Sequence, residues 1–485
     1  MDERVALLRP GLLIGDEWRT AGSGGEIDHV NPSTGKRQAT FPIAGSAEID
    51  DAVGAARAAL RSWRQTVPVA RRAVLNRIGE LIREHADELA TINALEVGTP
   101  AALSRMRYAA GITAFEYHAG WIDRLTGDTI PMGPGQALDF TLLEPVGVVA
   151  AILTWNHPLA NIQMVVAPAL AAGCSVVIKP PEAAPFACLR FGQLCEEAGL
   201  PPGVVNVVPG GPDAGDALAR HPGVDKISFV GGGAIGARIQ AAAAASLTPL
   251  VLELGGKSAA IVFPDANLDT AVRFAVGVTG NSGQGCTVPS RLLVHEDVYD
   301  EVIERMVPAL AAVKVGDPFE EDTLMGPVIN EAACTRILEL VARARDGGAG
   351  TLLCGGERLG GSLADGWFLP PTVFGDVDPT SELAQEEVFG PVLAITRFAD
   401  EEEAIALANG TRYGLAAYLI TQDIDRALRV ASELDAGNIG INGAGAPAGW
   451  SAPSGGVKHS GYGKVGGREG IMEYIRTKNV LVALS

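Results

Sequence analysis

The chain has 485 residues, more than a single hydrophobic core usually organises, so its length predicts two or three domains. The net charge of −19 argues against a nucleic-acid partner, because binding to a phosphate backbone requires clustered Lys and Arg side chains. The six cysteines form no Cys-x-x-Cys pair and no zinc-type spacing with histidine, so we expect neither a metal site nor a disulfide framework. No signal peptide or membrane-spanning stretch is evident, which favours a cytoplasmic protein with no membrane partner.

The segments before Val146 and the last residues of the chain predict helices and projecting strands. Ser46 begins a capped helix, and a second helix with an apolar stripe over 75–92 should stop near Gly98, because glycine favours a left-handed cap. The β-prone residues 129–132 and 139–143 flank a turn at 133–135 and predict an exposed hairpin. The alternating apolar pattern of 477–485 predicts an edge strand that pairs with a sheet of a neighbouring chain.

From Val146 onward, apolar runs of strand length alternate with helical stretches. This rhythm predicts a parallel sheet with helices on both faces, and it restarts at Ser258, where we expect a second α/β domain.

Cys286 lies in the stretch TGNSGQGCTVPSR, which runs from Thr279 to Arg291. Glycines on its N-terminal side leave the backbone N–H groups and the thiol open to a ligand, which favours a reactive thiol. The alternative is a small core residue in a glycine loop, and the local sequence leaves both open.

Two glycine-rich or polar segments follow predicted strands. Gly231, Gly233 and Gly236 have the G-x-G-x-x-G spacing that brings backbone N–H groups to a phosphate, although such a spacing also arises by chance in a chain with 60 glycines. Lys179 and Glu182 end another strand and suit ribose hydroxyls, or else form a solvated loop pair.

Asn156 and Glu253 also stand at strand ends, where parallel sheets place their ligands. The Asn156 side chain could donate to a developing oxyanion or could simply form an Asx turn. Glu253 is flanked by leucines and followed by glycines, so its carboxyl should have a raised pKa and could act either as a general base or as a ribose ligand.

Together these motifs resemble the aldehyde dehydrogenase superfamily over nearly the whole chain. The matching motifs are Trp-Asn-x-Pro at 155–158, Lys-Pro-x-Glu at 179–182, Glu-Leu-Gly-Gly-Lys at 253–257, Gly-Gln-x-Cys at 283–286, Glu-x-Phe-Gly-Pro at 387–391 and Gly-Gly-x-Lys-x-Ser-Gly at 455–461. The resemblance implies an α/β fold with a Rossmann-like cofactor domain (1–126 and 146–257), an α/β catalytic domain (258–460) and a hairpin and C-terminal oligomerisation element (127–145 and 461–485). It also implies a homodimer or homotetramer.

The resemblance further implies the roles of the site residues. Cys286 would be the nucleophile, Asn156 and the Cys286 N–H the oxyanion hole, and Glu253 the base for deacylation, with Lys179 also in the catalytic set. The implied cofactor contacts are Trp155, Lys179, Glu182, Gly231, Gly236, Leu254, Glu387 and Phe389. The implied substrate pocket contains His157, Met164, Gly285, Thr287 and Ser454.

Three departures from the family pattern concern cofactor, substrate and assembly. Gly232 replaces a common serine and removes one hydroxyl contact to the cofactor. His157 and Ser454 replace aromatic residues, so we expect a wider and more polar pocket than betaine aldehyde would select, because that cation favours an aromatic cage. Val465 replaces a common glutamate, which we expect to affect a structural or interface contact.

The implied activity is NAD-dependent oxidation of an aldehyde to its acid, through a cysteine thioester that water hydrolyses. Glu182 favours NAD by repelling a 2′-phosphate, and NADP is the alternative cofactor. A CoA-acylating semialdehyde dehydrogenase and a catalytically silent member of the fold are the alternatives. The presence of Glu253 argues against the first, and the joint presence of Cys286, Glu253 and Asn156 argues against the second.

Overall fold

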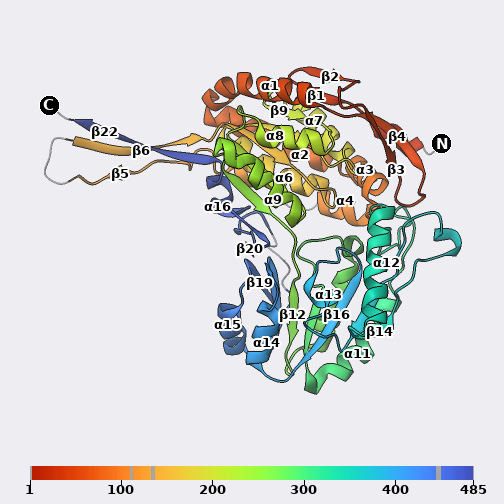
Figure 1. Ribbon diagram of the computed structural model, residues 1–485. Helices are drawn as coiled ribbons and strands as arrows, with labels where there is room; N and C mark the ends of the chain where they lie inside the picture. The colour runs from red at the N-terminus through yellow and green to blue at the C-terminus, as the bar shows by residue number, and fades with distance from the viewer. Residues whose placement is uncertain (1–2, 110–112, 133–136, 444–448, 484–485) are drawn as a thin grey trace.

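The computed structural model describes residues 3–109, 113–132, 137–443 and 449–483, and it contains two large sheets packed between helices (Figure 1). The α/β class predicted from the alternating apolar runs is confirmed. Within the described ranges, no helix is both long and apolar enough to cross a membrane.

The first sheet has a parallel centre and antiparallel edges. Its strands in spatial order are β2 (Glu17–Arg19), β1 (Leu12–Ile14), β9 (Val205–Val207), β8 (Ser175–Lys179), β7 (Val148–Ile152), β10 (Lys226–Val230), β11 (Leu250–Glu253) and β21 (Gly461–Tyr462). The helices that belong to this half of the molecule are α1 (Ser46–Gln65), α2 (Pro68–Glu84), α3 (Ala86–Val97), α4 (Ala101–Ala109), α5 (Ala114–Ala119), α6 (Pro158–Ala172), α7 (Phe186–Glu197), α8 (Pro212–Arg220) and α9 (Gly233–Ala243). The single helix expected over 75–92 is wrong, because the chain breaks at His85 between α2 and α3.

Both faces of this sheet are buried, as the uninterrupted apolar strands predict. On β7, Val149 and Ala151 belong to a core cluster with α2, α3, α6 and α7, whereas Val148 and Ala150 belong to a second cluster with α1, α8 and α9. Successive side chains of a strand point to opposite faces, so one strand supplies both cores.

The second sheet begins at 259, close to the restart predicted at Ser258, and is parallel except for its first pair. Its strands in spatial order are β14 (Thr351–Cys354), β15 (Thr372–Gly375), β16 (Val392–Phe398), β13 (Arg291–His295), β12 (Ala259–Val262), β18 (Ala416–Ile420) and β19 (Asn438–Ile441). The accompanying helices are α10 (Leu268–Val276), α11 (Glu296–Ala311), α12 (Glu331–Asp346), α13 (Glu382–Gln385), α14 (Glu401–Asn409) and α15 (Ile424–Glu433).

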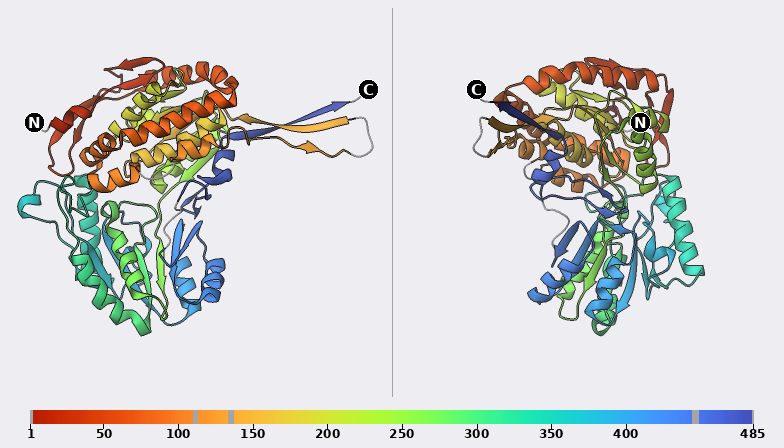
Figure 2. Two further views of the ribbon diagram at one scale, coloured as in Figure 1. Left: turned by 180° about the vertical axis from the view of Figure 1, so that it is seen from behind. Right: turned by 60° about the vertical axis from the view of Figure 1, so that its left-hand side comes forward.

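A third sheet extends away from the body of the molecule as a long arm, which we call the tongue (Figure 2). It consists of β5 (Thr129–Ile130), β6 (Ala137–Pro145) and β22 (Ile475–Ala483). The predicted hairpin is confirmed by the antiparallel pairing of β5 with β6, and its turn lies outside the described residues. β22 pairs along its whole length with β6 of its own chain, and its other edge has no partner strand among the described residues, so its addition to a neighbour's sheet stays a prediction.

The base of the tongue is anchored to the first sheet by Tyr474, which follows α16 (Gly467–Met472). Its side chain is almost fully buried, and its hydroxyl lies 3.0 Å from the Ser228 hydroxyl on β10. Next to it, the Lys226 ammonium donates to the Glu473 carboxylate at 2.7 Å. These contacts fix the direction in which β22 leaves the body.

Replacing Tyr474 by phenylalanine should lower the free energy of unfolding by about 1–2 kcal/mol, because Ser228 keeps a buried hydroxyl without its partner. The measurement is the thermal unfolding midpoint at a fixed scan rate. Tyr462→Phe is the matched control, since that side chain is 43% exposed and its hydroxyl has no described partner. Equal midpoints for the two variants would contradict the anchoring role.

Candidate active site

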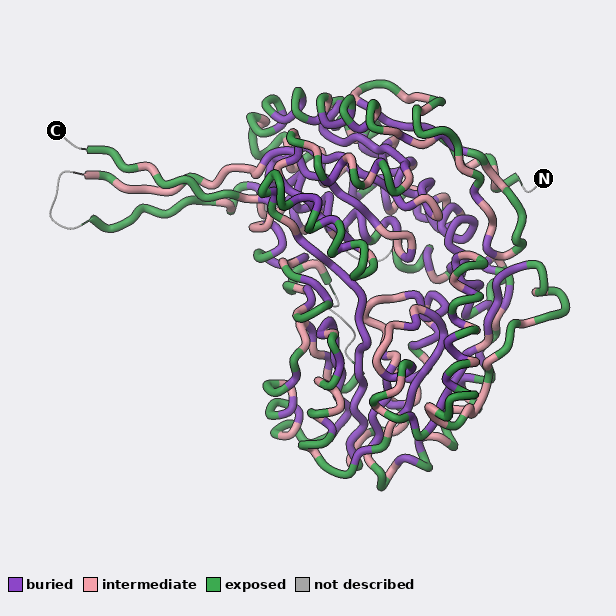
Figure 3. The backbone as a smooth tube through the Cα atoms, viewed as in Figure 1, coloured by how far each residue is buried: buried purple, intermediate pink, exposed green. Residues whose placement is uncertain are grey.

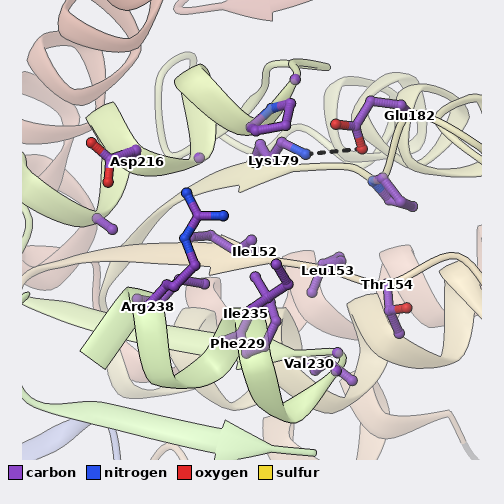
Figure 4. A pocket seen from close by; sticks show the side chains of 18 of the residues that line it. Ile152, Leu153, Thr154, Lys179, Glu182, Asp216, Phe229, Val230, Ile235 and Arg238 are labelled. Carbon is purple, nitrogen blue, oxygen red and sulfur yellow. Dashed lines mark hydrogen bonds and ion pairs between the residues drawn. The ribbon is translucent and has the colours of Figure 1, made fainter. Parts of the chain in front are cut away.

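Two connected cavities lie at the carboxyl ends of the parallel strands of the first sheet. One, of about 280 Å³, lies between α8 and α9 and reaches β8 (Figure 4). The other, of about 430 Å³, contains Cys286 and faces the second half of the molecule. Both are lined by Trp155, Val230 and Gly231, so the two cavities share a wall and form one elongated site.

The smaller cavity has the features of a dinucleotide site. The loop 231–233 leads from β10 into α9, and a Cβ added at Gly232 or Gly233 would meet nothing within 4 Å, so the helix N-terminus is open to a ligand. Gly236 does not line the cavity. A Cβ there would lie 2.7 Å from Leu254, so this glycine instead lets α9 pack closely on the β11 loop.

Lys179 and Glu182 lie on the opposite wall, where Lys179 donates to Glu182 across 3.3 Å (Figure 4). Burial lowers the pKa of Lys179, and the Glu182 carboxylate opposes this shift. The pair presents an ammonium and a carboxylate side by side, an arrangement that fits the two hydroxyls of a ribose. Pyrophosphate at the α9 N-terminus and ribose at this pair fit a nicotinamide dinucleotide.

Cys286 lines the larger cavity and follows a loop with an unusual backbone conformation. Asn281, Ser282 and Gly283 are consecutive left-handed residues, with φ of 49°, 56° and 72°. At Gly283 a Cβ would lie 2.0 Å from the Gly390 carbonyl oxygen, so only glycine fits this approach. The Gln284 side chain donates to the Asn281 carbonyl and accepts from the Ile329 N–H, which fixes the turn before the cysteine.

Asn156 is tied directly to this loop. One of its side-chain N–H groups donates to the Gln284 backbone carbonyl at 3.0 Å, and its backbone carbonyl accepts from the Asn281 side-chain amide at 2.9 Å. The amide nitrogen carries a second hydrogen, and Asn156 lines the cavity beside Cys286. Sequence reasoning missed Asn281, whose only signal was its place in the Asn-Ser-Gly run before the cysteine.

Burial is the largest cause of the pKa shifts of Glu253 and Cys286, the two groups that could react. Desolvation raises the pKa of Glu253 to about 8; the Lys464 ammonium opposes this shift and the Glu473 carboxylate adds to it. One Glu253 carboxyl oxygen is buried without a hydrogen-bond partner in the described part of the chain. Burial, with the nearby Glu253 and Glu387 carboxylates, raises the pKa of the Cys286 thiol to about 12. The resting cysteine is therefore a thiol that needs a base.

Glu387 and Phe389 precede β16 of the second sheet and line the larger cavity. Glu387 accepts from the Gly256 N–H at 3.0 Å, and burial raises the pKa of its carboxyl. Phe389 meets Trp155 edge to face, with ring centroids 5.3 Å apart. Both side chains line the larger cavity where it approaches the dinucleotide site.

Four of the five predicted pocket residues line the larger cavity, namely His157, Met164, Thr287 and Ser454. Gly285 is the exception, because a Cβ there would face the Val288 side chain of its own loop. Val465 was expected at a structural or interface contact. It forms a β-bridge with Ser454, and it also lines the larger cavity. Other lining residues that sequence reasoning missed are Ala160, Asn161, Arg336, Leu415 and Trp450. The described residues contain no group of three or more His, Cys, Asp or Glu side chains placed to hold a metal ion.

Comparisons with known proteins identify the family of the chain. The profile of the Aldehyde dehydrogenase family matches residues 18–480. The chain is 40% identical to a chloroplastic betaine aldehyde dehydrogenase of Beta vulgaris, over 98% of this chain and 96% of that protein. It is 39% identical to the peroxisomal aminoaldehyde dehydrogenase 1 of Pisum sativum, over 97% and 95% of the two chains.

Solved structures give the same result. A betaine aldehyde dehydrogenase from Staphylococcus aureus in complex with NAD⁺ superposes with a TM-score of 0.96 at 36% identity, covering 99% of this chain and 97% of that one. An E. coli NADP dependent enzyme superposes with a TM-score of 0.95 at 37% identity, covering 99% of both chains. The resemblance found in the motifs is thus confirmed along the whole sequence and fold, and the chain belongs to the aldehyde dehydrogenase family of NAD(P)-dependent enzymes.

Proposed function

We propose that this protein oxidises an aldehyde to its carboxylic acid with NAD, through a thioester on Cys286 that water hydrolyses. The observation that carries the proposal is the convergence of Cys286, Asn156 and Glu253 on one cavity that continues into a dinucleotide-shaped cavity. The residues belong to distant parts of the chain, and each brings a different chemical capacity to the same space.

The first step requires removal of the thiol proton as sulfur attacks the aldehyde carbon. Glu253 is suited to this, because it lines the same cavity as Cys286 and its charge influences the pKa of the thiol. The attack places a negative charge on the former carbonyl oxygen. The free N–H of Asn156 and the Cys286 backbone N–H would stabilise it, and one such donor typically contributes about 3 kcal/mol to the lowering of the barrier.

NAD, when bound, supplies the acceptor for the hydride that leaves this carbon. Glu253 releases its proton to solvent and then takes a proton from the water that attacks the thioester. The sulfur leaves as thiolate, and Cys286 is reprotonated for the next turn. A pKa of about 8 suits a carboxylate base near neutral pH, since a base with an ordinary pKa would accept the water proton less readily.

The substrate side of the cavity supports a bulky, polar aldehyde rather than betaine aldehyde. Trp450 gives one aromatic wall, but His157, Ser454 and Val465 do not complete a cage for a cation. Burial and the nearby Arg107 guanidinium lower the pKa of His157 to about 4. His157 is therefore uncharged near pH 7 and offers a cationic substrate no opposite charge.

We also propose the domain division 1–126 with 146–257 for cofactor binding, 258–460 for catalysis, and 127–145 with 461–485 for assembly into a homodimer or homotetramer. The tongue supports the last part, because it carries exposed apolar side chains far from the body (Figure 3). These are Ile130, Leu138, Leu142, Leu481 and Val482, and the exposed Met132 follows β5 directly. Of these, Leu138, Leu142 and Val482 share one face of the tongue, and this exposed apolar face would be costly in water unless another chain covers it.

The chemistry predicts NADH formation at 340 nm without CoA in a panel of aliphatic, aromatic, amino and semialdehyde substrates. Cys286→Ala should abolish it, while Cys354→Ala, which changes the other partly exposed cysteine, should leave it intact. Formation of NADH only when CoA is present would replace hydrolysis by the acylating alternative. Best turnover with betaine aldehyde would refute the proposed pocket preference.

The raised pKa of Glu253 predicts a pH dependence of turnover. The base acts only when deprotonated, so the rate should rise between about pH 7 and pH 9 with a midpoint near 8. Glu253→Gln should lower turnover by about 10²- to 10⁴-fold and remove this limb. The control Glu469→Gln, at an exposed position on α16, should keep the wild-type turnover and its rise with pH. A limb that persists in Glu253→Gln would assign the titration to another group.

The tongue predicts a concentration-independent oligomer at micromolar protein. Light scattering should give a dimeric or tetrameric mass for the wild type. The double variant Leu138→Glu with Val482→Glu should give a smaller one, because these residues lie opposite each other on one face of the tongue and two charges would enter the covered face. Leu324→Glu is the control, since Leu324 is also exposed but lies in the catalytic half. A monomeric wild type would eliminate the proposed assembly.

A further inference from the structure

The outer end of the dinucleotide cavity carries two opposite charges on facing walls. Asp216 lies on α8 and Arg238 lies on α9, and both line the cavity (Figure 4). The Arg238 guanidinium extends from α9 into the space between α8 and the wall that carries Lys179. The surrounding lining residues are mostly apolar, namely Ile152, Ala219, Phe229, Ile235, Ile239 and Ala242.

Neither charge is fully used by the protein itself. One oxygen of Asp216 accepts from Arg220 at 2.8 Å on its own helix, and the other oxygen has no hydrogen bond among the described residues. Arg238 makes no hydrogen bond or ion pair with any residue that the structure describes. A carboxylate and a guanidinium held apart across a mostly apolar slot suit a flat ligand with a polar edge and an aromatic face.

The order of groups in a dinucleotide indicates what reaches this slot. If the proposed function holds, the pyrophosphate lies at the N-terminus of α9 and a ribose lies at Lys179 and Glu182. The group beyond that ribose, on the side of Asp216 and Arg238, is then the purine base. Adenine offers an exocyclic amine that donates to a carboxylate, and a ring face on which a guanidinium can stack.

We propose that Asp216 and Arg238 recognise the adenine base, Asp216 by accepting from its 6-amino group and Arg238 by stacking on its ring. This inference rests on the proposed function for the placement of the dinucleotide, but it adds a determinant of base selectivity. Asp216 then distinguishes adenine from a 6-oxopurine, whose oxygen would face the carboxylate without a shared hydrogen. Arg238 contributes affinity without that distinction, because both purines have an aromatic face.

The test is calorimetric binding of NAD⁺ and of its hypoxanthine analogue, in which an oxygen replaces the 6-amino group. No aldehyde is needed, so the measurement is independent of turnover. The wild type should bind NAD⁺ about tenfold more tightly than the analogue. Asp216→Asn should bring this ratio close to one or invert it, because an amide can donate to the oxygen. Asp213→Asn is the matched control, since Asp213 lies on α8 outside the cavity lining and should keep the wild-type ratio.

Arg238→Gln should weaken NAD⁺ and the analogue by the same factor, about three- to tenfold. A loss confined to NADP would instead place Arg238 at the ribose 2′-phosphate and overturn its role at the base. An unchanged ratio in Asp216→Asn, with NAD⁺ binding intact, would overturn the role of Asp216 while leaving the proposed function standing. A wild type that binds neither dinucleotide would overturn both, and unchanged unfolding midpoints verify that each variant is folded.

Discussion

The hydrogen bonds among Asn156, Asn281 and Gln284 are the contacts on which the rest of the site depends. Asn156 follows β7 of the first sheet, whereas the other two precede β13 of the second sheet. These bonds therefore set the position of the nucleophile relative to the cavity that would hold the cofactor. The loop can accept them only because its backbone is left-handed at three consecutive positions and lacks a side chain at Gly283.

The segment that carries Glu253 also buries ionisable groups, which costs folding free energy. Glu253 and Lys257 stand close together in sequence, and each has a buried polar atom without a described hydrogen-bond partner. Burial raises the pKa of Glu253 to about 8 and, with Arg291, lowers that of Lys257 to about 7. Groups held in this way oppose folding stability, since their charged forms lose water without full compensation. The place of Glu253 at the cavity is understandable if reactivity, not stability, determines this segment.

The parts of the fold that could be predicted from the sequence are those determined by local pattern. Apolar runs located the parallel strands, and polar residues at their ends located Asn156, Lys179 and Glu253, because the carboxyl ends of parallel strands meet at one edge. The local sequence pattern did not predict features that depend on contacts between distant residues. The break at His85 interrupts an otherwise regular apolar stripe, and the partner of β22 proved to be β6, more than 300 residues earlier.

The residues that line the substrate side of the larger cavity were the hardest to predict from the sequence. Trp450, Ser454 and Val465 come from a C-terminal segment, His157 follows β7, and Arg336 comes from α12. Their meeting at one cavity depends on how both sheets pack, so no spacing within the sequence could reveal it. These are also positions where a chain can change without disturbing Cys286, Asn156 or Glu253. Membership of the family therefore determines the reaction much more closely than the aldehyde, and similarity to relatives named for betaine aldehyde does not fix what this cavity selects.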